Sequence, residues 1–248
     1  MNSIMYEYNL PVDFPQEVLN EAELMPEIIT EKEISRRRDL RNVTTIGIDP
    51  HDSKDADDTI GLEFKDGKRF ISINIADVTH YIKPGSELDK EALRRSTSVY
   101  LVDRCVPMLP ERLSNGICSL KPNVDRLAFS VVFNIDSSGK IISEWHGKTV
   151  IHSDHRFSYE QAQSIIESVD KPISEVGKIL TEDAGLDMDY KRATELGSCV
   201  IQLNKLAKKI RKKRIKDGSI EMGGVEVKFE LAPDNKKPIG VYFKEQKE

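Results

Sequence analysis

The chain has 248 residues, of which 38% are hydrophobic and 32% charged, an ordinary composition for a soluble globular protein of one or two domains. No apolar run approaches the roughly 20 residues of a membrane span, and the first residues lack the basic and apolar regions of a secretory signal. We therefore expect neither a membrane protein nor a secreted one. The net charge of −5 weakly disfavours a nucleic-acid partner, although the distribution of charge matters more than the sum.

Residues 1–43 are interpreted as a lead-in segment ahead of one larger domain. Pro15–Ala22 begins with proline and carries acidic residues, which predicts a short helix. A basic cluster follows, made of Arg36–Arg38 with Arg41. This cluster could bind phosphates, but such clusters more often form a solvated face, and both interpretations stay open.

Three strands are predicted around a loop. Val43–Ile48 is the first strand, and Pro50 ends its regular pairing. Thr59–Phe64 is the second strand, and the Asp-Gly pair inside Lys65–Lys68 predicts a hairpin turn. Phe70–Ile75 alternates apolar and polar residues, as a strand does. We expect the sheet to present the loop between the first two strands at its edge, a common arrangement for an active site.

That loop contains four aspartates within ten residues, Asp49, Asp55, Asp57 and Asp58, with Asp52 nearby. Carboxylates this close together raise one another's pKa, and a bound cation would compensate for the crowding. Oxygen ligands suit Mg²⁺, Mn²⁺ or Ca²⁺, so the loop predicts a divalent-metal site. A solvated acidic loop that binds nothing is the alternative. An EF-hand is set aside because neither register places glycine and glutamate where that loop needs them.

Further elements follow along the chain. Ser86 is predicted to cap a helix over Glu87–Arg95. Leu127–Asp136 and Lys140–Ile151 are predicted to form a hairpin. Ser158 is predicted to cap a helix that extends to about residue 169.

The last third of the chain is expected to combine a connection, a long helix and two strands. The polar segment Lys171–Asp189 predicts a mobile connection, and the segment from Tyr190 to about Arg214 a helix. The second basic cluster, Lys208–Lys216, lies on this helix. It either forms a solvent-exposed face or binds phosphates, and both interpretations stay open. Val225–Leu231 and Ile239–Phe243 are predicted strands, joined by a turn at residues 234–237. The apolar residues at helical spacing, expected to form one buried face, are Leu196, Val200, Leu203, Ala207 and Ile210.

The three cysteines, Cys105, Cys118 and Cys199, are odd in number and form no CxxC pair. This argues against a disulfide framework or a zinc site. We expect three small buried thiols in a protein of the reducing cytoplasm. The pattern of elements predicts a mixed α/β (α+β) fold, with a mostly antiparallel or mixed sheet and packed helices. Neither a P-loop nor a Rossmann fingerprint is present.

Several blocks of this sequence resemble the ribonuclease R and ribonuclease II family of exoribonucleases, in matching order and spacing. The resemblance runs from about Asn9 to about Phe229 and is closest to ribonuclease R. The blocks that carry it are Ile48–Asp58, Ile75–Ile82, Ser98–Leu101, Pro107–Pro110, Leu113–Asn115 with Cys118–Leu120, and Ile151–Tyr159.

The resemblance implies the N-terminal part of an RNB-type catalytic domain over residues 44–248. It implies processive hydrolysis of RNA from a single-stranded 3′ end to nucleoside 5′-monophosphates, with Mg²⁺ as the metal and Mn²⁺ as a possible substitute. Asp49, Asp55, Asp57 and Asp58 match the motif aspartates one for one and are assigned jointly to catalysis and metal binding, with Asp57 the least replaceable. Tyr100 matches a tyrosine that stacks on a base near the 3′ end; a core tyrosine is the alternative.

The resemblance also implies that the chain is incomplete. Family catalytic domains continue past the position of Glu248, with a glutamate-bearing helix and an arginine-rich segment that contacts the scissile phosphate, and they carry cold-shock and S1 barrels. An arginine at the transition state is worth several kcal/mol of barrier. We therefore expect a fragment that is weakly active or inactive alone.

Two other functions stay open, and so does the oligomeric state. One is a non-catalytic RNA-binding fragment, whose affinity would depend strongly on salt. The other is a metal-stabilised scaffold without a role in RNA binding. Among further polar residues, His80 has no assigned role. His152 and His155 are expected to be structural, and Asp77 either supports a backbone turn beneath the site or contacts the metal.

Overall fold

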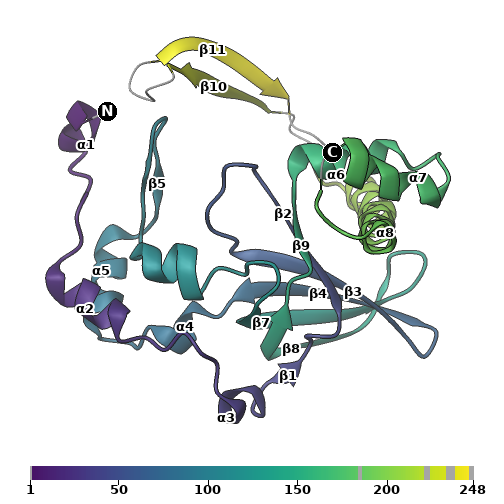
Figure 1. Cartoon of the computed structure of the whole chain (residues 1–248), viewed down its shortest axis with the longest axis horizontal. Coiled ribbons are helices and arrows are strands. Elements are labelled where there is room, and N and C mark those ends of the chain that lie inside the picture. The colour runs from purple at the N-terminus through teal and green to yellow at the C-terminus, as the bar shows by residue number, and fades with distance from the viewer. Residues whose placement is uncertain (1, 184–185, 221–223, 233–237, 246–248) are drawn as a thin grey trace. The chain divides into compact units, whose positions relative to one another are not determined.

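The computed structural model describes residues 2–183, 186–220, 224–232 and 238–245. The chain divides into two compact units, each assembled from segments that are distant in the sequence (Figure 1). Unit 1 contains Met1–Glu27, Val78–Ile117 and Met222–Glu248, and unit 2 contains Ile28–Asp77 and Cys118–Glu221. The predicted boundary after residue 43 stays a prediction.

Unit 1 is built from short helices and two hairpins. Its elements are α1 (Asn2–Glu7), α2 (Gln16–Glu23), α4 (Val78–Tyr81), α5 (Glu87–Arg95), the wide helical turn η1 (Arg112–Ile117), the hairpin β5 (Val99–Tyr100) and β6 (Cys105–Val106), and the hairpin β10 (Val225–Leu231) and β11 (Pro238–Glu245). The helix predicted over Pro15–Ala22 is confirmed by α2, and the Ser86 hydroxyl caps α5 as predicted. Both predicted C-terminal strands are confirmed, while the turn predicted at residues 234–237 lies outside the described residues.

Unit 2 is organised around a mixed seven-stranded sheet with the order β1-β8-β7-β4-β3-β2-β9, counted over the described residues. The strands are β1 (Arg38–Asp39), β2 (Thr44–Asp49), β3 (Asp58–Lys65), β4 (Lys68–Ala76), β7 (Asp125–Ile135), β8 (Ile141–His152) and β9 (His155–Ser158). β1 pairs with β8 and β2 pairs with β9 in parallel, and the remaining neighbours are antiparallel. The Asp-Gly turn forms as predicted, because Asp66 and Gly67 both adopt positive φ, 52° and 70°.

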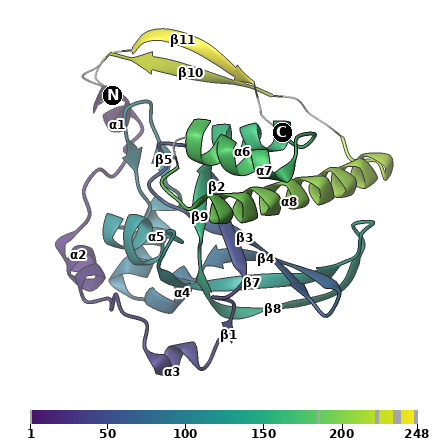
Figure 2. The same ribbon diagram turned by 45° about the vertical axis from the view of Figure 1, so that its right-hand side comes forward.

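Helices of unit 2 cover one face of this sheet (Figure 2). They are α6 (Tyr159–Glu167), α7 (Ile173–Lys178), the wide turn η2 (Ile179–Asp183) and α8 (Tyr190–Lys216); α3 (Glu31–Ile34) precedes β1. Alternation along the strands sends Ile46, Leu62 and Ile71 into this core, where α6 and α8 also bury their apolar stripes. On the opposite face Val43, Ala128 and other residues form a second, smaller core.

Two expectations for the helical layer are wrong. The segment Lys171–Asp189 contains α7 and η2 rather than only a mobile connection, because the buried side chains of Val176 and Leu180 pack against α8 beside Gly197. The second wrong expectation concerns the buried face of α8. Ala207 was expected to be buried but is exposed, while its neighbour Leu206 is buried. In the described part of the chain, no helix has both the length and the apolar character that a bilayer crossing requires.

Candidate functional site: an acidic loop at the end of the sheet

The acidic loop, Asp49–Asp58, lies where two paired strands part. β2 and β3 pair through Thr44–Ile46 and Ile60–Leu62 only. Beyond that point β2 continues along β9 up to Asp49, whereas β3 begins at Asp58 beside β4. Because the two strands hold different neighbours at this end, the residues between them leave the sheet as a loop.

A buried alanine anchors the middle of this loop. Ala56 is 2% exposed; its N–H donates to the Ser119 hydroxyl (3.0 Å) and its carbonyl accepts from the Leu120 N–H (2.8 Å). The Asp57 carbonyl accepts from the N–H of Ala76 at the end of β4 (2.9 Å). The main chain of the loop is therefore held on both sides of Asp57.

The first half of the loop is held by Arg156 of β9. Its Nη1 donates to the Ser53 carbonyl (2.7 Å), and the Ser53 hydroxyl donates to the carbonyl of Asp55 (2.7 Å). Arg156 lies opposite Gly47 in the register, and a Cβ on that glycine would touch both Arg156 and the Asp49 carboxylate. These contacts place a guanidinium next to the crowded carboxylates.

Electrostatics set this loop apart from an ordinary solvated one. Burial raises the pKa of Asp49; Arg156 acts in the opposite direction, and the charges of Asp58, Asp55 and Asp57 raise it further. The Asp49 Oδ2 atom is buried and has no hydrogen-bond partner among the described residues. An unpaired buried carboxylate oxygen is costly, and a cation is the partner that such an atom needs.

Asp57 shows the same effect, since burial raises its pKa and the charges of Asp55 and Asp58 raise it further. The four predicted site aspartates therefore lie close enough for their charges to affect one another. Carboxylate oxygens and a buried oxygen without a partner fit a hard divalent cation. Within the described residues, however, no three of the His, Cys, Asp and Glu side chains are already arranged around a common metal position.

Asp77 serves the structure beneath the loop. Its carboxylate pairs with Arg37 at 2.7 Å, and both side chains are buried, at 3% and 0% exposure. Arg37 also pairs with Glu33 and donates to the carbonyls of Ala128 and Thr149. The interpretation that Asp77 supports the backbone is favoured over a metal contact. For Arg37, the expectation of a solvated or phosphate-binding residue is wrong.

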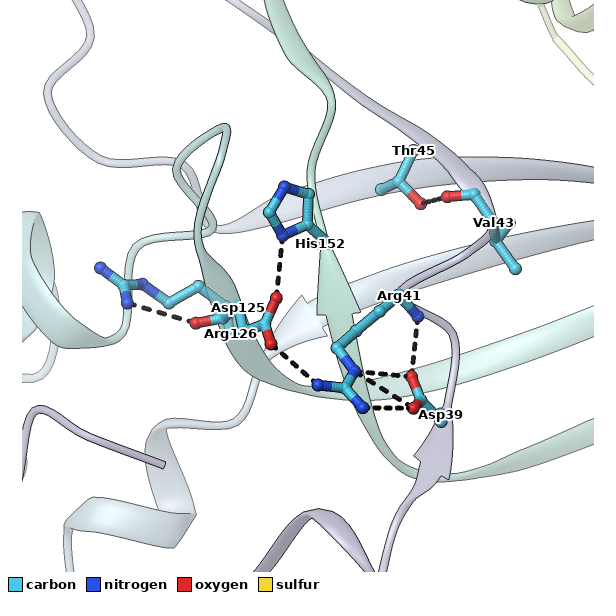
Figure 3. Close-up of polar contacts among 7 residues, drawn as sticks. All are labelled: Asp39, Arg41, Val43, Thr45, Asp125, Arg126 and His152. Atoms are coloured by element: carbon cyan, nitrogen blue, oxygen red, sulfur yellow. Dashed lines mark hydrogen bonds and ion pairs between the residues drawn. The ribbon is translucent and has the colours of Figure 1, made fainter. Parts of the chain in front are cut away.

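Another member of that basic cluster, Arg41, belongs to a surface chain of ion pairs (Figure 3). Asp39 accepts from Arg41, whose Nη1 contacts Asp125 at 3.0 Å, and Asp125 contacts the His152 Nδ1 atom at 2.8 Å. His152 therefore has the hydrogen-bonded structural role that was expected.

The neighbours of His152 in sequence are also engaged elsewhere. Asp154 accepts from the Thr45 N–H (2.7 Å) and forms an ion pair with Arg192 of α8, which ties the helix to β2. His155 packs edge-on against Phe157, and burial lowers its pKa, so the neutral ring is favoured. A His-Asp-His metal group at this position is thus not formed.

Tyr100 ends β5 and is 68% exposed, so the alternative of a core tyrosine is wrong; base stacking stays a prediction. Its cross-strand partner Cys105 is exposed as well, contrary to the expectation of three buried thiols. His80 packs edge-on against Tyr81.

Sequence reasoning missed the residues that hold the loop in place. Ser119 and Arg156 lie within blocks that carry the resemblance, but neither was given a role. Their function follows from hydrogen bonds to residues 63 and 103 positions away, which no local pattern reveals.

Comparison with known proteins places the chain in a family. The RNB domain model matches residues 37–248. DIS3-like exonuclease 2 of Schizosaccharomyces pombe is 42% identical over 221 residues, which cover 88% of this chain and 23% of the relative. Ribonuclease R of Mycoplasmopsis pulmonis is 42% identical over 184 residues, covering 73% of this chain and 25% of the relative.

Solved structures agree. The structure of Mycoplasma genitalium RNase R in complex with ribose-methylated single-stranded RNA superposes with a TM-score of 0.81 at 27% identity, covering 99% of this chain and 35% of that one. The fold prediction is thereby confirmed. The chain spans about a quarter of the length of the curated relatives named above. On this sequence and structural evidence, the chain belongs to the RNB-domain family of ribonuclease R and the DIS3-like exonucleases.

Proposed function

We propose that this chain carries the metal-binding part of a 3′-to-5′ exoribonuclease that hydrolyses RNA processively to nucleoside 5′-monophosphates. The observation that carries the proposal is the acidic loop: four aspartates at the family's motif positions, anchored at the ends of β2 and β3, with the buried Asp49 Oδ2 lacking a partner among the described residues. The proposed setting is the reducing cytoplasm, in keeping with the three free cysteines.

Mg²⁺ is the proposed metal, and Mn²⁺ a workable substitute. Asp49, Asp55, Asp57 and Asp58 would hold it, because hard carboxylate oxygens are its preferred ligands and their mutual repulsion would be relieved. When bound, magnesium in such a site activates a water molecule and stabilises the leaving oxygen of a phosphodiester. Arg156, Ser119 and Ala76 hold the loop backbone for this purpose, and Asp57 is proposed as the least replaceable ligand.

The proposed substrate is RNA with a single-stranded 3′ end. Tyr100, 68% exposed at the end of β5, offers a ring on which any base can stack, which suits a sequence-tolerant enzyme. Mycoplasma genitalium RNase R has been solved with single-stranded and with double-stranded RNA, which supports an RNA substrate for this relative.

A cleavage assay tests the proposal. The chain is incubated with a 5′-labelled RNA carrying a 3′ tail, with and without Mg²⁺, beside an Asp57→Asn variant. Any cleavage is expected to be weak, to depend on magnesium, to shorten the RNA stepwise from the 3′ end and to vanish in the variant. Internal cuts, or cleavage that persists in Asp57→Asn, would contradict it.

A second candidate function is RNA binding without turnover. It is favoured by the lack of a preformed three-residue metal group among the described residues, and Tyr100 would still be available. In that case the chain would bind RNA with strong salt dependence but release no mononucleotides with Mg²⁺.

A further inference from the structure

A hollow of about 420 Å³ lies at the end of the sheet opposite to the acidic loop. β3 begins in that loop at Asp58 and ends seven residues later at Lys65, so about 25 Å of strand separates the two places. The hollow is lined by the β3–β4 turn and the β7–β8 turn, including Phe64, Lys68 and Ile142. Nothing in the proposed function so far uses this end of unit 2.

One wall of the hollow combines an aromatic ring with a cation. The Phe64 side chain is 57% exposed, and the Arg69 guanidinium lies 5.5 Å from the centre of its ring. Arg69 Nε is buried without a hydrogen-bond partner among the described residues. An exposed ring beside a half-buried arginine offers a base a stacking surface and places a positive charge near a bound phosphate.

Asp136 also lines the hollow, but its carboxylate does not fully neutralise the positive charge of Arg69. The Asp136 Oδ1 atom accepts from the Ser138 N–H (2.8 Å), the Ser138 hydroxyl (2.6 Å) and the Lys140 N–H (3.0 Å). These bonds lower the pKa of Asp136 and turn its carboxylate into its own β7–β8 turn. The carboxylate is therefore engaged in closing that turn.

The basic half of α8 contacts one residue that lines the hollow. Lys209 Nζ donates to the carbonyl of Ser137, a lining residue (2.8 Å), and the β7–β8 turn curls towards α8 (Figure 2). Lys205, Lys212 and Lys216 share a helix face with Lys209, since their spacing is i, i+4, i+7 and i+11. We call these four residues the lysine stripe.

The charge of this helix exceeds what its own structure requires. Cations near a helix C-terminus offset the macrodipole within the last turn, yet the stripe extends over three turns. From Leu196 to Lys216 the sequence contains no Asp or Glu, and all four stripe residues are exposed. In a chain of net charge −5, such a concentration points to a polyanionic ligand.

We propose that the hollow and the lysine stripe form an accessory binding surface for single-stranded RNA, which holds the strand upstream of the 3′ end that reaches the acidic loop. This inference rests on the proposed function for its choice of RNA. Phe64 stacks on a base, while Arg69 and the stripe contact phosphates. Because the two sites are about 25 Å apart, only an RNA long enough to span them gains from both.

Binding measurements with charge-reversal pairs test the inference. The variant Lys212→Glu/Lys216→Glu leaves the Lys209–Ser137 bond intact, and Lys171→Glu/Lys178→Glu makes the same change of net charge on exposed lysines elsewhere in unit 2. Fluorescence anisotropy with a chelator present measures the affinity for a short and a long labelled oligoribonucleotide over a salt series. Chelation prevents cleavage without disturbing phosphate contacts.

The stripe variant is expected to bind the long RNA more weakly than the control variant and to bind the short RNA equally well. Its salt slope should be smaller by about 1.4, because two phosphate contacts at about 0.7 each are lost. Phe64→Ala should weaken long-RNA binding about fivefold or more.

Equal affinity of the two charge-reversal variants for long RNA would overturn the inference. So would an acidic polypeptide that binds the stripe more tightly than RNA does, since the surface would then serve a protein partner. Failure of the proposed function gives a different pattern: the unmodified chain binds no Mn²⁺ in calorimetry, while the stripe variant still loses affinity for long RNA.

Discussion

Arg37→Met should destabilise the protein more than any exposed substitution in the same cluster. Arg37 and Asp77 are 0% and 3% exposed and lie 2.7 Å apart. Removing one member of a buried pair leaves an uncompensated charge and costs about 3–5 kcal/mol. Lys148, at 3.9 Å from Asp77 and 52% exposed, compensates little, so we expect about 4 kcal/mol, a large share of the stability of a typical domain.

Arg38→Met is the matched control for this prediction. Arg38 is exposed and lies 4.7 Å from the centre of the Trp145 ring, so its loss should cost below about 1 kcal/mol. Urea unfolding followed by circular dichroism measures both variants. The reasoning would be refuted by an Arg37→Met cost no larger than that of Arg38→Met, since the buried pair would then contribute nothing that a well-packed apolar side chain cannot replace.

Three further predictions concern the loop, acid stability and helix packing. Ser119→Ala strips the buried Ala56 N–H of its acceptor, so it should lower the free energy of unfolding by about 1–3 kcal/mol and weaken Mn²⁺ binding in calorimetry; unchanged values would show that the anchor is dispensable. Hydrogen bonding to Arg94 lowers the pKa of Glu91 from 4.5 to about 2, so its stabilisation is present above pH about 4.5 and fades towards pH 2. Glu91→Gln should therefore cost about 1–2 kcal/mol in urea unfolding at pH 7, after allowance for the exposed arginine, and a loss that persists undiminished at pH 2 would contradict this cause. Gly197→Leu would overlap a side chain of α7, so it should cost about 2 kcal/mol and lower Tm by about 4 °C or more, and a calorimetric Tm equal to that of the unmodified chain would count against the packing.

The elements with strong local signals were predictable from the sequence. Ser158 forms a capping box with Gln161, as its spacing predicts. Period-2 alternation located β4 to within two residues at its start and one at its end. The position of the acidic loop was also predictable, because Pro50 and the two predicted strands bound it.

Long-range pairing is the part that local patterns could not reveal. Arg37 and Asp77 are 40 positions apart in the sequence, and a run of three arginines looks like a solvated surface until the fold buries one of them. α7 and η2 were missed because their segment is mostly polar, and their stability comes from Val176 and Leu180 meeting a glycine on α8. Tertiary contact, rather than propensity, decides such segments.

Metal binding by the acidic loop is the central claim, and isothermal calorimetry with Mn²⁺ tests it most directly. Asp57→Asn removes a proposed ligand, while Asp52→Asn changes an exposed aspartate of the same loop that has no assigned role. The account predicts that the unmodified chain and Asp52→Asn bind the metal with similar affinity and that Asp57→Asn loses most of it. Equal binding by all three proteins, or none by the unmodified chain, would contradict the account and return the loop to a solvated acidic turn.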